Sequence, residues 1–471
     1  MLNLALRSYS FSLSVIDHDE STYILGGKTI FEGGQLYKDV IDAKPPGIFV
    51  IYYLNTFLFN DLIFGSRVMG WIAVSLIATL LCLFMKNLFN LRISDGIFTG
   101  IIFSMMMCYS FPGNINLTTY ALDVNTEHFY ILFLLISFLF IIRKKSLLDF
   151  GIAGFCFGIA FNISYAVFPH LIALSIFSIN FNEIKQLRNI SNNIKRLLIL
   201  WGSFLIPFLS IGLYFFIQNR FNEYSFIAFE MTNNYLFDYS LIKLFQFFKF
   251  YFIRIWPVVI LLIISSFIML KKNDYRSKYV NILIWLSVSF ITPLFVGQSL
   301  HYTYPLALPI SVASTFSIIY FKNWNRYLYY STISILIFMM VSSSYIRFKW
   351  KFNVPDKNRI IANELAEISH DKDLIHIDAV YHHIIYYLVG KKPITPYYHP
   401  PSLIYRYNVY QIDRKNEYQN IFNKKPKYVL VKGEPSSKII DEYLIKDYSI
   451  EKTLYDDFHI YKINENINIQ F

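Results

Sequence analysis

The chain is short of charged residues and of cysteine. Asp, Glu, Lys and Arg make up 16% of its 471 residues, whereas a soluble domain usually carries about 25%. The cysteines all lie inside apolar runs and show no CxxC spacing: Cys82, Cys108 and Cys156. The low charge argues against an ordinary soluble domain, and the cysteines indicate neither a disulfide framework nor a zinc site.

Apolar and aromatic residues are abundant instead, at 55% and 19% of the chain. They gather in runs, and a run of about 20 apolar residues can cross a bilayer. Ten runs recur, at residues 66–85, 96–111, 128–142, 150–163, 165–180, 197–217, 251–270, 279–297, 305–321 and 327–346. We therefore predict an all-α polytopic membrane protein. A further run at 48–59 is too short to span and predicts an interfacial or re-entrant helix.

The net charge of +11 does not indicate a nucleic-acid-binding protein. Lys and Arg lie mostly in short loops between apolar runs, and alternate loops are almost free of them; 112–127 and 298–304 contain none. Because Lys and Arg favour cytoplasmic loops, the loop 17–47 and the segment after residue 346 are predicted to face outward.

The sequence divides into two predicted domains. Residues 1–346 form the transmembrane domain, and the charged segment 347–471 forms a small α/β extracytoplasmic domain. Local patterns in this second domain predict an amphipathic helix, two buried strands, and a helix end with two more strands, at 360–368, 373–380, 426–433 and 441–463.

The polar loop 17–47 carries a cluster of charges next to apolar runs. Charge beside lipid is costly, so such a cluster is a candidate functional site. Asp19 and Glu20 are adjacent, and on a helix they would point about 100° apart, which predicts separate roles. Lys44 precedes two prolines, which restrict it to an extended backbone and hold its charge in place.

Two motifs carry a resemblance to a known family. The loop contains Asp19-Glu20, Tyr23, Gly33-Gly34, Tyr37, Asp39 and Lys44-Pro45-Pro46-Gly47, and a later segment contains His301-Tyr302 ahead of Pro305 and Pro309. With these the chain resembles the GT-C membrane glycosyltransferases, in particular the bacterial relatives of protein O-mannosyltransferases and of lipid A aminoarabinose transferases. The resemblance covers about residues 15–346 and extends to the α/β tail. We expect the family's first transmembrane helix to be missing from this sequence.

The resemblance implies an inverting glycosyltransferase, a hexosyl or pentosyl transferase of the cell envelope. It would be an integral protein of the bacterial cytoplasmic (inner) membrane and would act at the outer face of that membrane. Its donor would be a polyprenyl-phosphate-linked sugar, and its acceptor a hydroxyl of a lipid, glycan or protein. The alternatives are a transporter or flippase of polysaccharide or lipid-linked sugar, and an inactive relative. A transporter would carry charges within its spans and paired repeats, and neither is evident in the sequence.

The expected roles follow from this chemistry. A carboxylate can deprotonate the acceptor, which suggests Asp19 as base and Glu20 as a sugar or acceptor contact. Residues expected to bind the donor phosphate are Lys44, His301 and Arg254. Residues expected to bind substrate are Tyr23, Asp123, Glu127, Tyr302 and Tyr304. Structural alternatives remain for several of them: a snorkelling lysine, an aromatic belt at the membrane surface, and an acid at a helix N-terminus.

No cofactor is expected. Asp17-His18-Asp19 spells a DxD, a pattern that holds a divalent metal in many glycosyltransferases. A metal is nevertheless disfavoured, because cationic side chains alone can stabilise a departing monophosphate. The histidines of the tail lack a reliable ligand spacing and are predicted to lie on the surface: His376, His382, His383 and His399.

Overall fold

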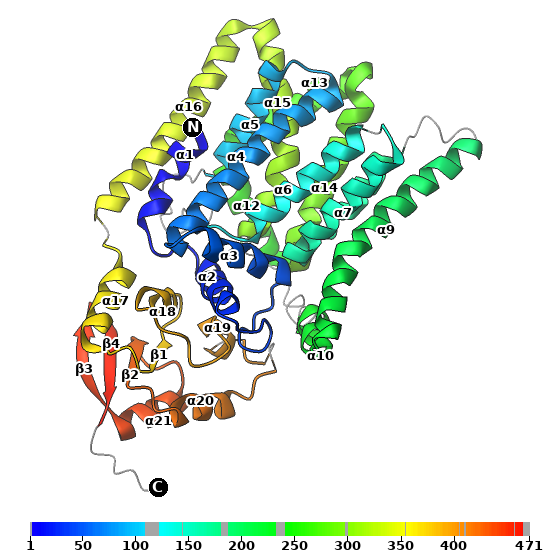
Figure 1. Ribbon diagram of the computed structural model, residues 1–471. Helices are drawn as coiled ribbons and strands as arrows, with labels where there is room; N and C mark the ends of the chain where they lie inside the picture. The colour runs from blue at the N-terminus through cyan, green and yellow to red at the C-terminus, as the bar shows by residue number, and fades with distance from the viewer. Residues whose placement is uncertain are drawn as a thin grey trace.

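The fold is a bundle of apolar helices with a small α/β domain below it (Figure 1). The computed structural model describes residues 2–108, 122–143, 145–179, 187–231, 241–296, 300–353, 355–404, 406–408, 411–455 and 457–464. Among these residues, four helices are long and apolar enough to cross a membrane: Leu62–Phe89, Thr126–Arg143, Ile190–Ile217 and His301–Trp324. The prediction of an all-α polytopic membrane protein with a small α/β domain is confirmed.

The helical part runs from residue 2 to residue 353. Its α-helices are α1 (Leu2–Arg7), α2 (His18–Phe31), α3 (Pro46–Leu58), α4 (Leu62–Phe89), α5 (Ile93–Met106), α6 (Thr126–Arg143), α7 (Leu147–Ile163), α8 (His170–Ser178), α9 (Leu187–Ile217), α10 (Phe221–Ser225), α12 (Leu241–Arg254), α13 (Trp256–Lys271), α14 (Asn273–Val296), α15 (Ala307–Trp324) and α16 (Arg326–Asn353). Short 3-10 or π segments are η1 (Ser8–Ser12), η3 (Tyr165–Val167), η5 (Phe226–Met231) and η6 (Leu300–Leu306).

Glycines let several helices approach at backbone distance. A Cβ on Gly154 of α7 would lie 2.1 Å from the carbonyl oxygen of Leu200 on α9. A Cβ on Gly27 of α2 would lie 2.5 Å from the backbone of Tyr52 on α3. Helices in membranes pack closely through such small residues. The α2–α3 contact fixes both ends of residues 32–45, the part of the polar loop that joins these two helices.

The run at 48–59 is a helix, α3, which begins at Pro46. Proline suits the first turn because its missing N–H would have no partner there. At 13 residues, α3 is shorter than the roughly 17–25 residues of a span, as the sequence predicted. The helix follows directly on Lys44 and Pro45, so it holds the end of the polar loop against the bundle.

The C-terminal part is a four-stranded sheet with helices. The sheet order is β1-β2-β4-β3, with β1 and β2 parallel and the other pairs antiparallel. The elements are α17 (Lys357–Ile368), β1 (Ile375–Asp378), α18 (Ile384–Leu388), α19 (Pro400–Ile404), α20 (Arg414–Asn423), β2 (Tyr428–Lys432), α21 (Lys438–Asp447), β3 (Tyr448–Leu454) and β4 (Phe458–Ile463). The helix and strands predicted from local patterns are confirmed.

Candidate functional site

The polar loop begins with a capped helix. Asp17 is the N-cap of α2, and its carboxylate accepts a hydrogen bond from the backbone N–H of Asp19, at 3.2 Å. Such a cap satisfies an N–H that has no partner within the helix. The first turn of α2 therefore presents His18, Asp19 and Glu20 at the junction between the helical bundle and the α/β domain (Figure 1).

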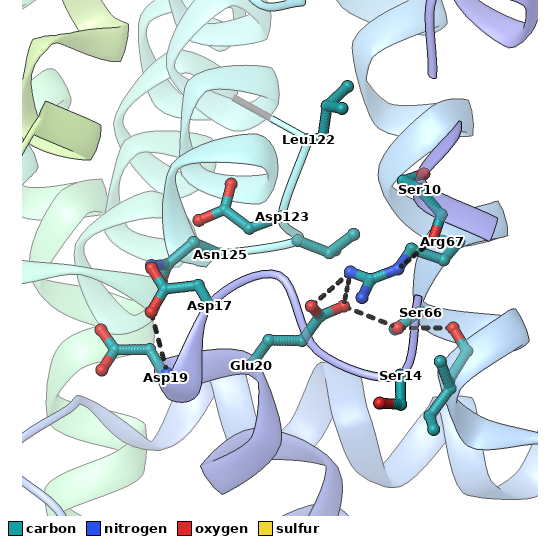
Figure 2. A network of polar contacts seen from close by, with 12 residues as sticks. Ser10, Ser14, Asp17, Asp19, Glu20, Ser66, Arg67, Leu122, Asp123 and Asn125 are labelled. Atoms are coloured by element: carbon teal, nitrogen blue, oxygen red, sulfur yellow. Dashed lines mark hydrogen bonds and ion pairs between the residues drawn. The ribbon is translucent and has the colours of Figure 1, made fainter. Parts of the chain in front are cut away.

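Asp19 and Glu20 point in different directions, as Figure 2 shows. Glu20 is 2% exposed, forms an ion pair with Arg67 of α4, and accepts a hydrogen bond from the Ser66 hydroxyl at 2.8 Å. Asp19 faces away from that pair, and its Oδ2 lies 3.4 Å from Nζ of Lys44. The two side chains therefore have separate surroundings. Both oxygens of Glu20 are occupied by α4, which does not fit the sugar or acceptor contact expected of Glu20 from the sequence.

The surroundings of Asp19 favour its charged form. Burial by itself would raise the pKa of Asp19, but Lys44, His18 and His399 together hold that pKa well below its usual value. Burial likewise opposes the charges of Asp17 and His18. Their hydrogen bond nevertheless lowers the pKa of Asp17 and raises that of His18. The first turn of α2 is therefore a set of charges that stabilise one another in a mostly buried place.

Lys44 is fixed by contacts on both sides. Its backbone N–H donates to Asp42 at 3.0 Å, and its carbonyl accepts from the Tyr37 hydroxyl at 2.8 Å. Its ammonium lies 5.8 Å from the centre of the Tyr302 ring. The loop motif and the later His-Tyr motif, far apart in sequence, thus meet at this lysine.

His301 lies on the same side of the site. Its ring is 4.2 Å from that of Tyr302, and His301 contributes to lowering the pKa of both Asp17 and Asp19. The side chain is 5% exposed, and its ring nitrogens have no hydrogen bond within the described residues. The structure therefore brings together four of the residues singled out in the sequence: Asp19, Lys44, His301 and Tyr302.

A second acidic group lies deeper, ahead of α6. The residues just before α6 are attached to α2 and α3. The Tyr23 hydroxyl of α2 donates to Asn125 at 3.1 Å, and the Tyr52 hydroxyl of α3 donates to the carbonyl of Val124 at 2.6 Å. Asp123 is fully buried, and neither of its carboxylate oxygens has a hydrogen bond among the described residues. Burial, reinforced by the charge of Asp17, raises the pKa of Asp123 well above its usual value.

The remaining predicted residues make other contacts. Glu127 is in the first turn of α6 and accepts a hydrogen bond from the Thr126 hydroxyl at 3.1 Å. Tyr304 packs its ring 5.9 Å from that of His128. Tyr23 serves as the link to Asn125 described above. Arg254 ends α12, but its side chain lies outside the described part of the chain.

The α/β domain supplies side chains that the sequence did not predict at the site. Nε2 of His383 lies 2.9 Å from the Thr22 hydroxyl, and the ring of His399 stacks on that of His18 at 4.7 Å. The surface prediction is therefore wrong for His376, His383 and His399, which are 4%, 0% and 3% exposed. His383 and His399 are covered by α2, and His376 lies within strand β1. Such contacts are long-range, and no local pattern signals them.

Replacing Asp42 tests the electrostatics of the loop through stability. Burial, opposed in part by Lys44, raises the pKa of Asp42 to about 6 from its ordinary 3.8. The folded state thus binds this proton more tightly than the unfolded state, so Asp42 lowers stability as pH rises from about 4 to above 6. We expect Asp42→Asn to be more stable than wild type near pH 8, on the order of 1–3 kcal/mol, and equal to it near pH 4.

Thermal and denaturant unfolding in detergent at the two pH values measure this difference. Asn can still accept the hydrogen bond from the Lys44 N–H, so the turn should survive. The exposed Asp39→Asn on the same loop is the matched control and should show no such pH dependence. An Asp42→Asn protein that is equally destabilised at both pH values would contradict the assignment.

The structure of the whole chain is similar to solved structures of known proteins. The chain is similar in structure to ArnT from Cupriavidus metallidurans bound to undecaprenyl phosphate, with a TM-score of 0.66 over 98% of this chain and 97% of that one at 11% identity. The apo form of the same ArnT has a TM-score of 0.66, over 97% of this chain and 96% of that chain, at 10% sequence identity. The oligosaccharyltransferase of Archaeoglobus fulgidus, tethered to an acceptor peptide, has a TM-score of 0.50. The match covers 92% of this chain and 68% of that chain, at 13% sequence identity.

No family model matches the sequence, and no curated protein matches it. The likeness therefore concerns the fold, and it agrees with the resemblance carried by the two motifs. The chain has the fold of the GT-C membrane glycosyltransferases.

Proposed function

We propose that the protein is an inverting glycosyltransferase that moves a sugar from a polyprenyl phosphate to a hydroxyl acceptor. The observation that carries the proposal is the pairing of Asp19 with Lys44, 3.4 Å apart, at the end of the apolar bundle. A carboxylate can take the acceptor proton, and a fixed ammonium can stabilise the departing phosphate. The fold supports this assignment, because the similar ArnT structure holds undecaprenyl phosphate.

In the proposed step, Asp19 accepts the proton of the acceptor hydroxyl. The acceptor oxygen forms a bond to the anomeric carbon of the sugar, on the face opposite the phosphate. The bond between that carbon and the phosphate oxygen breaks, and polyprenyl phosphate leaves with the electron pair. Lys44 and His301 stabilise the leaving phosphate, and the configuration at the anomeric carbon is inverted.

The contact between Lys44 and Asp19 couples donor binding to catalysis. In the free enzyme Lys44 helps to keep the pKa of Asp19 low, which makes the carboxylate a weak base. A donor phosphate that binds Lys44 shares its positive charge, and this raises the proton affinity of Asp19. The base would thus become effective when the donor is in place.

A groove beside the loop suits the lipid part of a substrate. A cavity of about 580 Å³ lies between α3 and the end of α9. Apolar side chains line much of it: Phe49, Val50 and Tyr53 of α3, and Ile211, Tyr214 and Phe215 of α9. Pro46, two residues after Lys44, also lines it. A polyprenyl chain in this groove would place its phosphate near the lysine.

The proposed orientation puts the site on the outer face of the cytoplasmic membrane, where the loop and the α/β domain lie together. Single cysteines at exposed positions test this in a protein from which the native cysteines have been removed. We expect an impermeant maleimide to label Gln35→Cys and Lys415→Cys in intact cells, and to label Ser277→Cys after lysis only. The opposite pattern would invert the topology and contradict the orientation.

Asp19→Asn tests the base. We expect turnover to fall by roughly 10²-fold or more, the usual scale for a general base, while affinity for undecaprenyl phosphate is kept. Turnover is measured as release of undecaprenyl phosphate from a panel of undecaprenyl-phosphate-linked hexoses and pentoses. Asp39→Asn is the control and should behave as wild type, because that side chain is exposed. An Asp19→Asn protein with normal turnover would rule out this base.

Lys44→Ala tests the phosphate contact. A hydrogen bond to a charged group is worth about 1.5–3 kcal/mol, so affinity for free undecaprenyl phosphate should fall by roughly ten- to a hundredfold. Lys44→Arg should recover part of the loss, since the charge is kept but its geometry changes. The exposed Lys38→Ala on the same loop is the control. If Lys44→Ala binds the lipid normally but unfolds at a lower temperature, the lysine is a membrane anchor.

A further inference from the structure

An exposed tyrosine of the α/β domain lies against the first turn of α2. Tyr381 is in the turn between β1 and α18, and α18 packs on α2 (Figure 1). The ring centre of Tyr381 is 4.6 Å from that of His18, at an angle of 55°. Nε2 of His18 in turn lies 3.4 Å from Oδ1 of Asp19. A single side chain therefore separates this exposed ring from the carboxylate proposed as the base.

The turn holds Tyr381 in a costly conformation. Its φ is +68°, in the left-handed region, which side chains other than Gly, Asn and Asp rarely adopt. The residues that follow it are fixed. Nδ1 of His382 lies 2.7 Å from Oδ1 of Asn358, and Nε2 of His383 lies 2.9 Å from the Thr22 hydroxyl. The fold thus pays conformational energy to present a ring that stays half in solvent.

Backbone strain alone does not mark a site. Tyr455, in the turn between β3 and β4, is also exposed and also has a positive φ, of +52°. Its ring centre lies 5.0 Å from the ammonium of Lys357. Tyr381 differs in its contact with His18, next to Asp19. Tyr455 is therefore the matched control for any role of Tyr381 at the site.

The side chains that lead from Tyr381 to Asp19 become steadily less exposed. Tyr381 is 51% exposed, and the side chains of His18 and Asp19 are 24% and 15% exposed. Beyond them, Nε2 of buried His399 lies 3.7 Å from Oδ1 of Asp19 and has no hydrogen bond within the described residues. Buried polar atoms are rarely left without a partner. A hydroxyl placed between these two atoms would hydrogen-bond to both.

The two carboxylate oxygens of Asp19 face different partners. Oδ2 lies 3.4 Å from Nζ of Lys44, the residue proposed to bind the donor phosphate. Oδ1 faces His18 and His399. In an inverting transfer the acceptor attacks the face of the sugar opposite the leaving group. The acceptor hydroxyl therefore belongs on the Oδ1 side, and the rest of the acceptor extends towards Tyr381.

We propose that the acceptor hydroxyl belongs to a sugar ring, which packs on Tyr381 and directs that hydroxyl to Asp19 and His399. One face of a pyranose carries mostly C–H groups, and the flat face of an aromatic ring is apolar with negative charge density, which attracts them. A serine side chain or a simple lipid alcohol has no such ring. The inference rests on the proposed function and narrows its acceptor to a glycan or glycolipid.

The proposed step is unchanged in its balance. The sugar oxygen that gives its proton to Asp19 bonds to the anomeric carbon of the donor, and polyprenyl phosphate leaves with the electron pair. The product contains a new glycosidic bond between two sugars. Tyr381 takes no part in the proton transfer; it positions the acceptor.

Binding of simple glycosides tests the proposal without any transferase assay. The probes are the methyl glycosides of glucose, galactose, mannose and N-acetylglucosamine. They are offered to the full-length protein in lipid nanodiscs with undecaprenyl phosphate, because many detergents are themselves glycosides. We expect saturation-transfer NMR to show contact between the protein and the C–H groups of at least one glycoside. Absence of contact for all of them would overturn the proposal, whatever the turnover.

Tyr381→Gly separates a binding role from a structural one. Glycine adopts a positive φ without strain, so this variant should unfold at the same temperature as wild type or a higher one. Its affinity for the glycoside should fall by roughly tenfold, the scale of a lost aromatic stack, while affinity for undecaprenyl phosphate is kept. Tyr381→Phe should bind as wild type, because the ring remains, and so should Tyr455→Gly. A less stable Tyr381→Gly protein with unchanged glycoside affinity would overturn the proposal.

Turnover distinguishes this inference from the proposed function. Release of undecaprenyl phosphate from the linked sugars should rise on addition of a methyl glycoside, and should not rise with a Ser/Thr peptide or with octanol. Turnover with the peptide or the alcohol alone would keep the proposed function and overturn the sugar acceptor. Glycoside binding without turnover for any acceptor would support the sugar site and contradict the proposed function.

Discussion

The buried ion pair between Glu20 and Arg67 holds the site in place. Glu20 is 2% exposed and Arg67 is fully buried, and removal of one partner of such a pair typically costs about 3–5 kcal/mol because a lone charge is left behind. Arg67 also donates from Nε to the carbonyl of Ser10 at 3.1 Å. The pair therefore fixes the rotation of α2 against α4 and attaches the N-terminal segment. Since neighbouring helical residues point about 100° apart, fixing Glu20 also fixes Asp19.

The α/β domain holds α2 from the opposite side. Thr22 contacts His383 at 2.9 Å, Thr29 contacts the Tyr398 hydroxyl at 2.9 Å, and the Ile41 N–H donates to the carbonyl of Pro396 at 2.9 Å. These contacts follow α2 and then the loop that leads to Lys44. The helix that begins the site is thus fixed between a membrane helix and a polar domain. The α/β domain is part of the site's construction.

The fold was largely predictable because its signals are local. Apolar runs predicted the helical bundle, and alternating patterns predicted β1 and β2. The site was predictable in part: the motifs indicated Asp19 and Lys44, and proline chemistry explained why Lys44 is fixed. Neither Arg67 as partner of Glu20 nor His399 beside Asp19 could be predicted. Both depend on contacts between distant segments, and a histidine in a polar stretch has the same local pattern whether it is exposed or buried.

Adjacent carboxylates acquire different properties here from their surroundings. Burial raises the pKa of Glu20, although Arg67 and Ser66 oppose that effect, whereas Lys44 and the histidines hold the pKa of Asp19 low against burial. Acids whose environments move their pKa values apart are suited to separate roles. Glu20 is engaged by α4 on both oxygens, and Asp19 faces the cations. A single step along α2 therefore separates the residue that anchors the helix from the residue that we propose as the base.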